Sequence, residues 1–188
     1  IPGTDEVRWK FETGDEIRTS PETWVSPTTG FAVIYVGSND GYLYALDVLT
    51  GELRWKYMAG GKVIGGPSIA FGHVYVGSDD GTLHALNGDS GEPLWKSKVP
   101  QIAPSKPATG QGLIYVGSRD GRLYALDLET GSQRWSYETE GPVLASPAVK
   151  GFVLIVGSDD GGVYGLDAQS GELLWRHKTG SPVQSSLS

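Results

Sequence analysis

The sequence predicts an all-β fold made of repeated four-stranded units, and three observations predict it. First, tryptophans recur with a strict spacing of 40 residues, at Trp55, Trp95, Trp135 and Trp175. Second, short apolar or alternating runs are separated by Asp-Gly, Ser-Gly and Thr-Gly pairs, which suit tight hairpins because glycine accepts a positive φ. Third, 28 glycines argue against helices, since glycine in a helix interior costs about 1 kcal/mol. About four 40-residue repeats of four antiparallel strands are typical of β-propeller blades, with a β-sandwich as the alternative.

Each repeat is expected to supply strands A to D, counted from the propeller axis outward. In the last repeat, strand A holds Ser146 and Pro147, strand B spans 153–157, strand C spans 163–167, and strand D holds Trp175. Strands B and C read as nearly continuous apolar runs, as expected for strands covered on both faces by neighbouring blades. We therefore expect one domain over residues 1–188, with repeat units at approximately 15–56, 57–96, 97–136 and 137–178.

The two ends carry incomplete repeats. Residues 7–12 read as a strand D without its A, B and C, and residues 182–188 read as a strand A without the rest. The chain is thus predicted to be part of a larger propeller, such as one of eight blades, or to complete itself by association. A homodimer is the expected assembly, because an open arc exposes two apolar blade faces, and a closed four-bladed ring is the alternative.

Composition limits the classes of partner. The formal net charge is −7 and there is no Lys/Arg stripe, so nucleic-acid binding is not expected. No run approaches the ~18 apolar residues of a membrane span, and any signal or anchor would lie outside these residues. The absence of cysteine removes disulfides and thiolate metal sites but leaves the compartment open. Partners are expected to be proteins or small ligands.

Four segments carry a resemblance to a known family. "ALDVLTGELRW", "ALNGDSGEPLW", "ALDLETGSQRW" and "GLDAQSGELLW" resemble the tryptophan-docking motif of the pyrroloquinoline-quinone-like (PQQ-like) β-propeller repeat family. The resemblance implies that Trp55, Trp95, Trp135 and Trp175 dock on the following blade. It also implies that Asp47, Asp127, Asp167 and the equivalent Asn87 bind amides of the C–D turn. Asn87 and Gly165, which replaces the first Ala, are mild departures from the motif.

The family contains enzymes and non-enzymes. PQQ-dependent dehydrogenases of this type are much longer, use a catalytic Asp and Ca²⁺, and often place a vicinal disulfide under the quinone. This chain has no cysteine and no loop long enough for such a site, so we predict no catalytic residue, cofactor or metal. The interpretation is a non-catalytic interaction or assembly scaffold, bacterial and extracytoplasmic by resemblance. A fragment of a PQQ-dependent dehydrogenase and a ligand-sensing domain of a bacterial Ser/Thr kinase remain alternatives.

Three local patterns favour structural over chemical roles. "GDSG" at 88–91 resembles a serine-protease motif, but it aligns with the C–D turns of the other repeats. Asp40, Asp80, Asp120 and Asp160 recur in B–C turns, where Arg119 stands in place of one acid of a calcium loop. His73, His84 and His177 are scattered over different repeat positions and form no metal set.

A candidate interaction face comes from an irregularity of the repeat. From Trp9 to Pro27 there are 18 steps, whereas Trp135 to Pro147 and its equivalents take 12, so six residues are inserted. The insertion is assigned to the D–A connection before the first blade, and it carries Trp24, either as a binding anchor or as a plug against a neighbouring blade. Because D–A and B–C loops share one end of a propeller, the predicted face comprises Asp15, Glu16, Arg18, Trp24, Asn39, Tyr42, Arg119 and Arg122.

Overall fold

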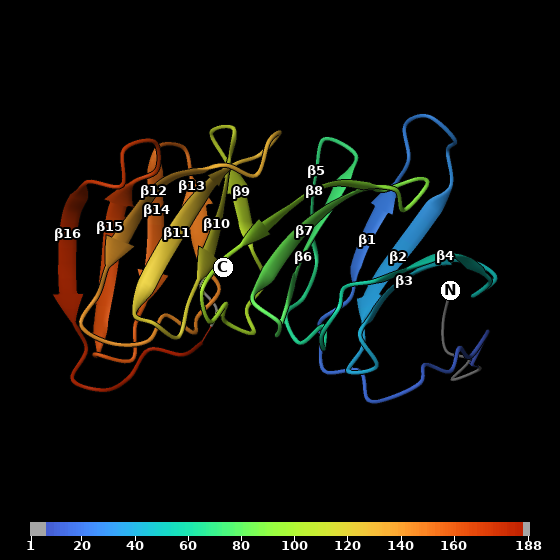
Figure 1. Cartoon of the computed structure of the whole chain (residues 1–188), viewed down its shortest axis with the longest axis horizontal. Coiled ribbons are helices and arrows are strands. Elements are labelled where there is room, and N and C mark those ends of the chain that lie inside the picture. The colour runs from blue at the N-terminus through green and yellow to red at the C-terminus, as the bar shows by residue number, and fades with distance from the viewer. Residues whose placement is uncertain (1–6, 186–188) are drawn as a thin grey trace, which may run out of the picture.

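The computed structural model describes residues 7–185, which form four antiparallel sheets of four strands each (Figure 1). Blade 1 contains β1 (Glu22–Val25), β2 (Ala32–Gly37), β3 (Tyr42–Asp47) and β4 (Leu53–Met58). Blade 2 contains β5 (Ser68–Ala70), β6 (His73–Ser78), β7 (Thr82–Asn87) and β8 (Pro93–Lys98). Blade 3 contains β9 (Ala108–Gly110), β10 (Leu113–Gly117), β11 (Arg122–Asp127) and β12 (Gln133–Glu138). Blade 4 contains β13 (Ala148–Lys150), β14 (Val153–Gly157), β15 (Gly162–Asp167) and β16 (Leu173–Lys178). The predicted all-β propeller fold is confirmed.

Every blade pairs its strands in sequence order, so the first and fourth strands are its two edges. The first strands of adjacent blades contact one another, β1 with β5, β5 with β9 and β9 with β13, which places them on the inner side of the arc. The predicted strand A at Ser146 and Pro147 is wrong in position, because β13 begins at Ala148. Proline has no N–H for the ladder, and the residue before it is restricted, so the strand starts after Pro147. No helix long and apolar enough to cross a membrane occurs in residues 7–185.

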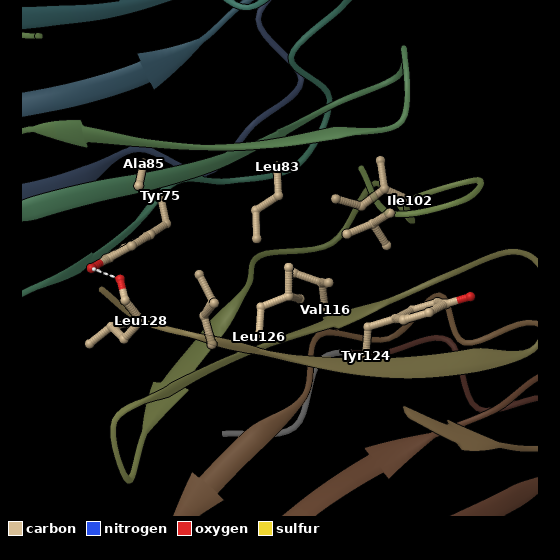
Figure 2. Packing of buried hydrophobic residues seen from close by; sticks show 10 residues of the cluster. Tyr75, Leu83, Ala85, Ile102, Val116, Tyr124, Leu126 and Leu128 are labelled. Carbon is tan, nitrogen blue, oxygen red and sulfur yellow. Dashed lines mark hydrogen bonds between the residues drawn. The ribbon is translucent and has the colours of Figure 1, made fainter. Parts of the chain in front are cut away.

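The hydrophobic core lies between blades. Between blades 2 and 3, Tyr75 and Leu83 of one sheet face Val116 and Leu126 of the next (Figure 2), and all four are at most 2% exposed. Side chains alternate between the two faces of a strand, so each middle strand contributes to the cores on both of its sides. This arrangement explains the nearly continuous apolar runs of strands B and C.

The repeated tryptophans join successive blades. The indole rings of Trp55, Trp95 and Trp135 lie over Gly91, Gly131 and Gly171, each in the C–D turn of the following blade, where a Cβ would overlap the ring. The Nε1 of Trp55 donates to Gly88 O at 2.9 Å, and that of Trp95 donates to Leu128 O at 3.1 Å. These glycines have φ between 70° and 75°, so both the close approach and the backbone conformation require glycine.

The four blades form an open arc, not a closed ring (Figure 1). Residues 7–12 lie in no strand, but Trp9 occupies the position of a docking tryptophan: its ring lies over Gly51 and its Nε1 donates to Val48 O at 2.9 Å. Phe11 packs edge-on against Tyr44 at 5.5 Å. The first face of blade 1 is therefore covered. The expectation of two open apolar faces is therefore wrong for this face, which Trp9 and Phe11 cover.

The other end of the arc is exposed. Trp175, on the last strand of blade 4, is 42% exposed, and Val153, Ile155 and Val163 are only half-buried. Residues 181–185 form no strand, although Val183 N donates to Ser158 O at 3.0 Å. The remainder of the predicted strand at 182–188, residues 186–188, lies outside the described residues.

Candidate interaction face

At one end of the blades, the B–C turns meet the connections that link one blade to the next. We call this end the B–C surface; it comprises turns 38–41, 79–81, 118–121 and 158–161, the first residue of the strand that follows each turn, and the D–A connections that contact them. The backbone N–H of Asn39 donates to Glu16 O at 2.9 Å, and that of Arg119 donates to Gln101 O at 2.9 Å. Val63 N in turn donates to Ser38 O at 3.1 Å. These bonds hold the backbone of the surface in place independently of its outward side chains.

A carboxylate in each B–C turn stabilises the turn from within. Asp40 accepts the N–H of Tyr42 at 2.9 Å and the hydroxyl of Tyr44 at 2.6 Å, and Asp120 accepts the equivalent bonds from Arg122 and Tyr124 at 2.9 and 2.6 Å. Burial raises the pKa of Asp40, but the hydrogen bonds from Tyr44 and the turn amides outweigh it and hold this pKa below its usual value. The turn aspartates are therefore engaged in hydrogen bonds that stabilise the B–C turns.

Five of the predicted face residues gather at blade 1. Arg18 and Glu16 form an ion pair with 2.7 Å between Nη2 and Oε2, and both side chains are more than half exposed. Asp15 accepts the N–H of Glu16 at 2.7 Å, and Asn39 follows in the adjacent turn. Tyr42 is half-buried, with Lys56 Nζ 4.6 Å from its ring centroid.

Arg119 and Arg122 lie at the same end of the arc, on blade 3. Arg122 forms an ion pair with Glu138 at 2.5 Å between Nη2 and Oε2. Arg119 donates through Nη1 to Ile102 O at 3.4 Å. These two arginines belong to a different blade from the Glu16–Arg18 pair, so the predicted residues form two groups along one surface rather than a single cluster.

Trp24 is not on this surface, and its predicted place is wrong. It lies in β1, paired with Val33 of β2, and its ring packs against Gly72 and Gly88 of blade 2, at the opposite end of the strands. The six-residue insertion is in the A–B loop at 26–31, because Glu22 pairs with Tyr35 as Ser68 pairs with Tyr75. The sequence did indicate this position, because Pro21 lies 12 residues after Trp9, the same step that separates tryptophan and proline in the other repeats. Matching Pro27 instead placed Trp24 in the D–A connection. The packing of its ring on blade 2 fits the role of a plug against a neighbouring blade, one of the two roles considered for it, and not that of an anchor in the D–A connection.

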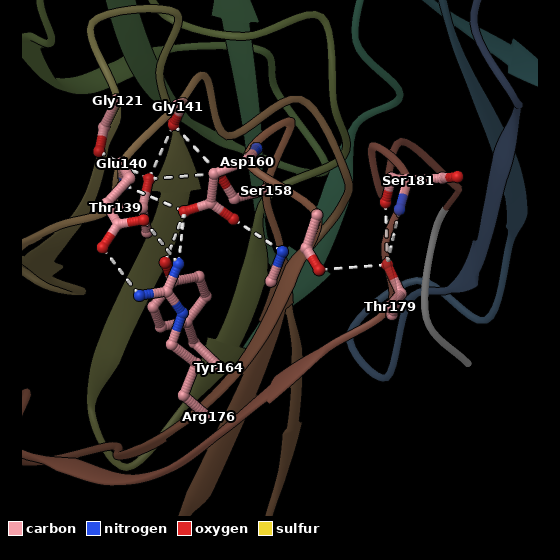
Figure 3. Close-up of polar contacts among 12 residues, drawn as sticks. Gly121, Thr139, Glu140, Gly141, Ser158, Asp160, Tyr164, Arg176, Thr179 and Ser181 are labelled. Carbon is pink, nitrogen blue, oxygen red and sulfur yellow. Dashed lines mark hydrogen bonds and ion pairs between the residues drawn. The ribbon is translucent and has the colours of Figure 1, made fainter.

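Sequence reasoning also missed a network between blades 3 and 4 on this surface (Figure 3). Arg176 binds both carboxylate oxygens of Glu140 at 2.8 Å and reaches Asp160 at 3.4 Å. Tyr164 donates to Asp160, and Glu140 N donates to the same carboxylate at 2.9 Å. The hydrogen bond to Glu140 raises the pKa of Arg176. No spacing rule connects residues 140 and 176, so only the fold brings them together.

The inner side of the arc holds a cavity of ≈ 620 Å³. Its charged lining consists of Arg18, Glu22 and Lys106, and Glu22 is already paired with Lys106. A Ca²⁺ ion needs six or more oxygen ligands, usually with several carboxylates. Among residues 7–185 no group of three or more Asp, Glu, His or Cys side chains could hold a metal ion. This donor set does not fit the calcium–quinone site of the PQQ-dependent dehydrogenases.

Repeats with a docking tryptophan, arranged as four-stranded blades, define a PQQ-like β-propeller. The family model described as "Outer membrane protein assembly factor BamB" matches residues 2–106 and again residues 84–188, so the chain belongs to this PQQ-like repeat family. No curated protein sequence gave a significant match.

Solved structures with the same architecture include both non-enzymes and enzymes. BamB from Moraxella catarrhalis superposes with a TM-score of 0.77 at 24% identity, over 97% of this chain and 59% of that one. The quinohemoprotein alcohol dehydrogenase ADHIIG from Pseudomonas putida HK5 gives 0.74 at 19% identity, over 93% and 35%. A europium-containing methanol dehydrogenase gives 0.79 at 16% identity, over 94% and 44%. At these identities the likeness shows the fold alone, and the chain spans less than two thirds of each of the three.

Proposed function

We propose that the chain is a non-catalytic scaffold that binds a protein partner through the B–C surface, outside the cytoplasm. The observation that carries the proposal is the B–C surface itself: exposed charged side chains of both signs stand on a backbone fixed by turn and inter-blade hydrogen bonds. Charge patterns of this kind select a partner and orient it. The description of the matched family model, an outer-membrane protein assembly factor, supports an assembly role in the bacterial envelope.

Site-specific photocrosslinking tests the binding face. A photoreactive amino acid at Arg122, on the B–C surface, should yield a crosslink to one discrete protein in a detergent extract of bacterial outer membranes. The matched control is the same group at Lys96, an exposed residue in the middle of the outer strand β8 and away from both ends of the blades. Equal products from both positions, or none from Arg122, would count against the proposed face.

The rival enzyme function is separated by a reconstitution. The chain is incubated with PQQ and Ca²⁺ and assayed for quinone absorbance and for alcohol-dependent dye reduction. We expect neither, because the inner cavity offers one carboxylate that is already paired with Lys106. Dye reduction would establish a dehydrogenase fragment instead. The kinase-sensor alternative is decided by whether kinase motifs and a membrane span accompany these repeats in the gene.

Self-association is a second candidate role, favoured by the outer face of blade 4. Leu154, Val156 and Leu166 of this blade pack toward blade 3, so the alternating Val153, Ile155 and Val163 point the other way. The equivalent residues of blade 3, Leu113, Tyr115 and Leu123, are at most 4% exposed because blade 4 covers them. We propose that a second copy of the chain covers this face, giving a homodimer.

A further inference from the structure

The end of the blades opposite the B–C surface exposes large apolar side chains. We call it the A–B surface; it comprises A–B turns 26–31, 71–72, 111–112 and 151–152 and C–D turns 48–52, 88–92, 128–132 and 168–172. Three of the four phenylalanines of the chain lie there, Phe31, Phe71 and Phe152, with exposed fractions of 52%, 86% and 69%. The inserted loop, 26–31, lies there too. The A–B turns therefore differ between blades in length and in sequence, and three of them expose a phenylalanine.

A groove of ≈ 560 Å³ opens beside Phe71, between blades 2 and 3. Tyr75 and Leu128 form part of its floor, and the Tyr75 hydroxyl donates to Leu128 O at 3.3 Å (Figure 2). Glu129 stands at its edge; burial and the charge of Glu129 raise the pKa of Tyr75 to about 12. The volume lies in the roughly 300–1,000 Å³ range of ligand pockets. Asp127 and Arg134 also line the groove and pair with each other at 3.8 Å, so Glu129 is the groove carboxylate that has no ion pair among residues 7–185.

The backbone of Phe71 is strained. Phe71 has φ 51° and Gly72 has φ 77°, so both central residues of this two-residue turn are left-handed, a geometry that favours Asn-Gly. A bulky side chain with positive φ is strained, because its Cβ crowds the backbone. At the equivalent position Gln111, with φ 55°, has a structural role, because its amide donates to Gly151 O at 2.9 Å. Phe71 has an exposed ring instead, so neither its conformation nor its side chain is explained by the fold.

The charge of the A–B surface indicates which partner it would accept. Its eight turns contain five carboxylates and no Lys or Arg: Glu52, Asp89, Glu92, Glu129 and Glu172. Within residues 7–185 none of the five is in an ion pair, and the neighbouring Arg54 and Arg134 are paired with Asp47 and Asp127. Such a field attracts cationic groups. It repels an anionic membrane surface and an identical acidic face of a second copy.

We propose that the groove beside Phe71 binds an extended segment of another protein in which apolar side chains alternate with Lys or Arg. An apolar side chain of the segment enters the groove against Phe71, Tyr75 and Leu128, and a neighbouring cation pairs with Glu129. The inference is independent of the binding role proposed for the B–C surface, since the two surfaces lie at opposite ends of the strands. Failure of the crosslink from Arg122 would leave this groove untouched.

The test uses two fluorescent peptides and fluorescence anisotropy. One peptide alternates Leu and Lys, and its twin alternates Leu and Glu. The parent chain should bind the Leu–Lys peptide at least about tenfold more tightly than the twin, with an affinity that falls as salt is added. Phe71→Asn should weaken binding by at least about tenfold, as expected for an anchor residue, while its melting temperature stays equal or rises, because Asn-Gly suits the turn. Glu129→Lys should reverse the preference between the peptides.

The matched control is Met58→Asn, which removes a 58% exposed apolar side chain at the other end of the blades and should leave binding unchanged. An equal loss in Phe71→Asn and Met58→Asn would overturn the proposal, as would equal binding of the two peptides. Two other occupants give distinct results. Phe71-dependent binding to phosphatidylglycerol vesicles would assign the groove to a membrane, and loss of self-association in Phe71→Asn would assign it to a second copy; either result overturns the proposal.

Discussion

His84 should make the stability of the chain depend on pH. Its side chain is 2% exposed between blades 1 and 2, with Nδ1 3.2 Å from the Tyr57 hydroxyl, and Nε2 has no hydrogen-bond partner among the described residues. Burial, together with the charge of Lys96, lowers the pKa of His84 from 6.5 to about 4. The folded chain therefore holds this imidazole neutral at a pH where the unfolded chain protonates it.

The sign and size of the effect follow from proton linkage. Because the folded pKa lies below the unfolded pKa, the stabilisation is complete above pH 6.5 and is lost as the pH falls from 6.5 towards 4. With pKa values of 6.5 and about 4, the free energy of unfolding should fall by about 2 kcal/mol between pH 7 and pH 5, and by about 3 kcal/mol at pH 4.

The variant His84→Tyr isolates this contribution. The other three blades have tyrosine at the equivalent position, Tyr44, Tyr124 and Tyr164, each donating to its turn aspartate. The Tyr137–Tyr164 pair, at 5.7 Å, shows that two tyrosines fit the equivalent interface. Urea unfolding followed by tryptophan fluorescence at pH 7 and pH 5 should show a stability advantage of the variant that grows as the pH falls.

The control is His177→Tyr, since His177 is exposed and its replacement should give no such trend. The reasoning would be refuted by a difference between parent and His84→Tyr that is the same at both pH values. It would also be refuted by an equal trend in the control.

Three further outcomes are expected. Trp135→Ala should lower the free energy of unfolding by roughly 3 to 5 kcal/mol in urea titrations, because the indole packs over Gly171 between two blades; an unchanged midpoint would remove the docking role. Ser90→Ala should leave stability and all activities nearly unchanged, because its hydroxyl only accepts the N–H of Glu92 at 3.3 Å; loss of a hydrolytic activity would reinstate the protease interpretation of "GDSG". Light scattering coupled to size exclusion should show a dimer, with Trp175→Glu restoring a monomer; a parent species of 20.0 kDa at high concentration would refute self-association through blade 4.

The fold was predictable because repetition multiplies a weak local signal. A single run such as "VLIVG" fits a buried strand or a short piece of buried helix. The order strand, Asp-Gly turn, strand and Gly turn occurs in four consecutive repeats, and this repetition fits only the blades of a propeller. The hairpin roles of Asp47 and Asn87 were also accessible, since both bind the amides two and three residues ahead. Interactions that span a few residues within one repeat can be read from the sequence.

Contacts between repeats could be predicted only where the repeat itself fixed them. The alignment on Pro27 misplaced the insertion and moved Trp24 to the wrong end of its blade, whereas Pro21 keeps the 12-residue step from Trp9 and strand pairing confirms that match. The Arg176–Glu140 pair joins residues 36 apart in two blades and has no counterpart in the repeat pattern. The covering of blade 1 by Trp9 and Phe11 depends on a segment that forms no strand.

Gly165 replaces an alanine of the other three repeats, and the tryptophan opposite it packs differently from theirs. Ala45, Ala85 and Ala125 are fully buried at this position, opposite tryptophans that extend onto the next blade. Trp175 lies opposite Gly165, and its ring occupies the space in which a Cβ at residue 165 would stand. With no following blade against it in residues 7–185, this tryptophan folds back onto its own sheet, a conformation that an alanine would block. Gly165 is therefore matched to the folded-back ring of Trp175, as Ala45, Ala85 and Ala125 are matched to tryptophans whose rings extend onto the next blade.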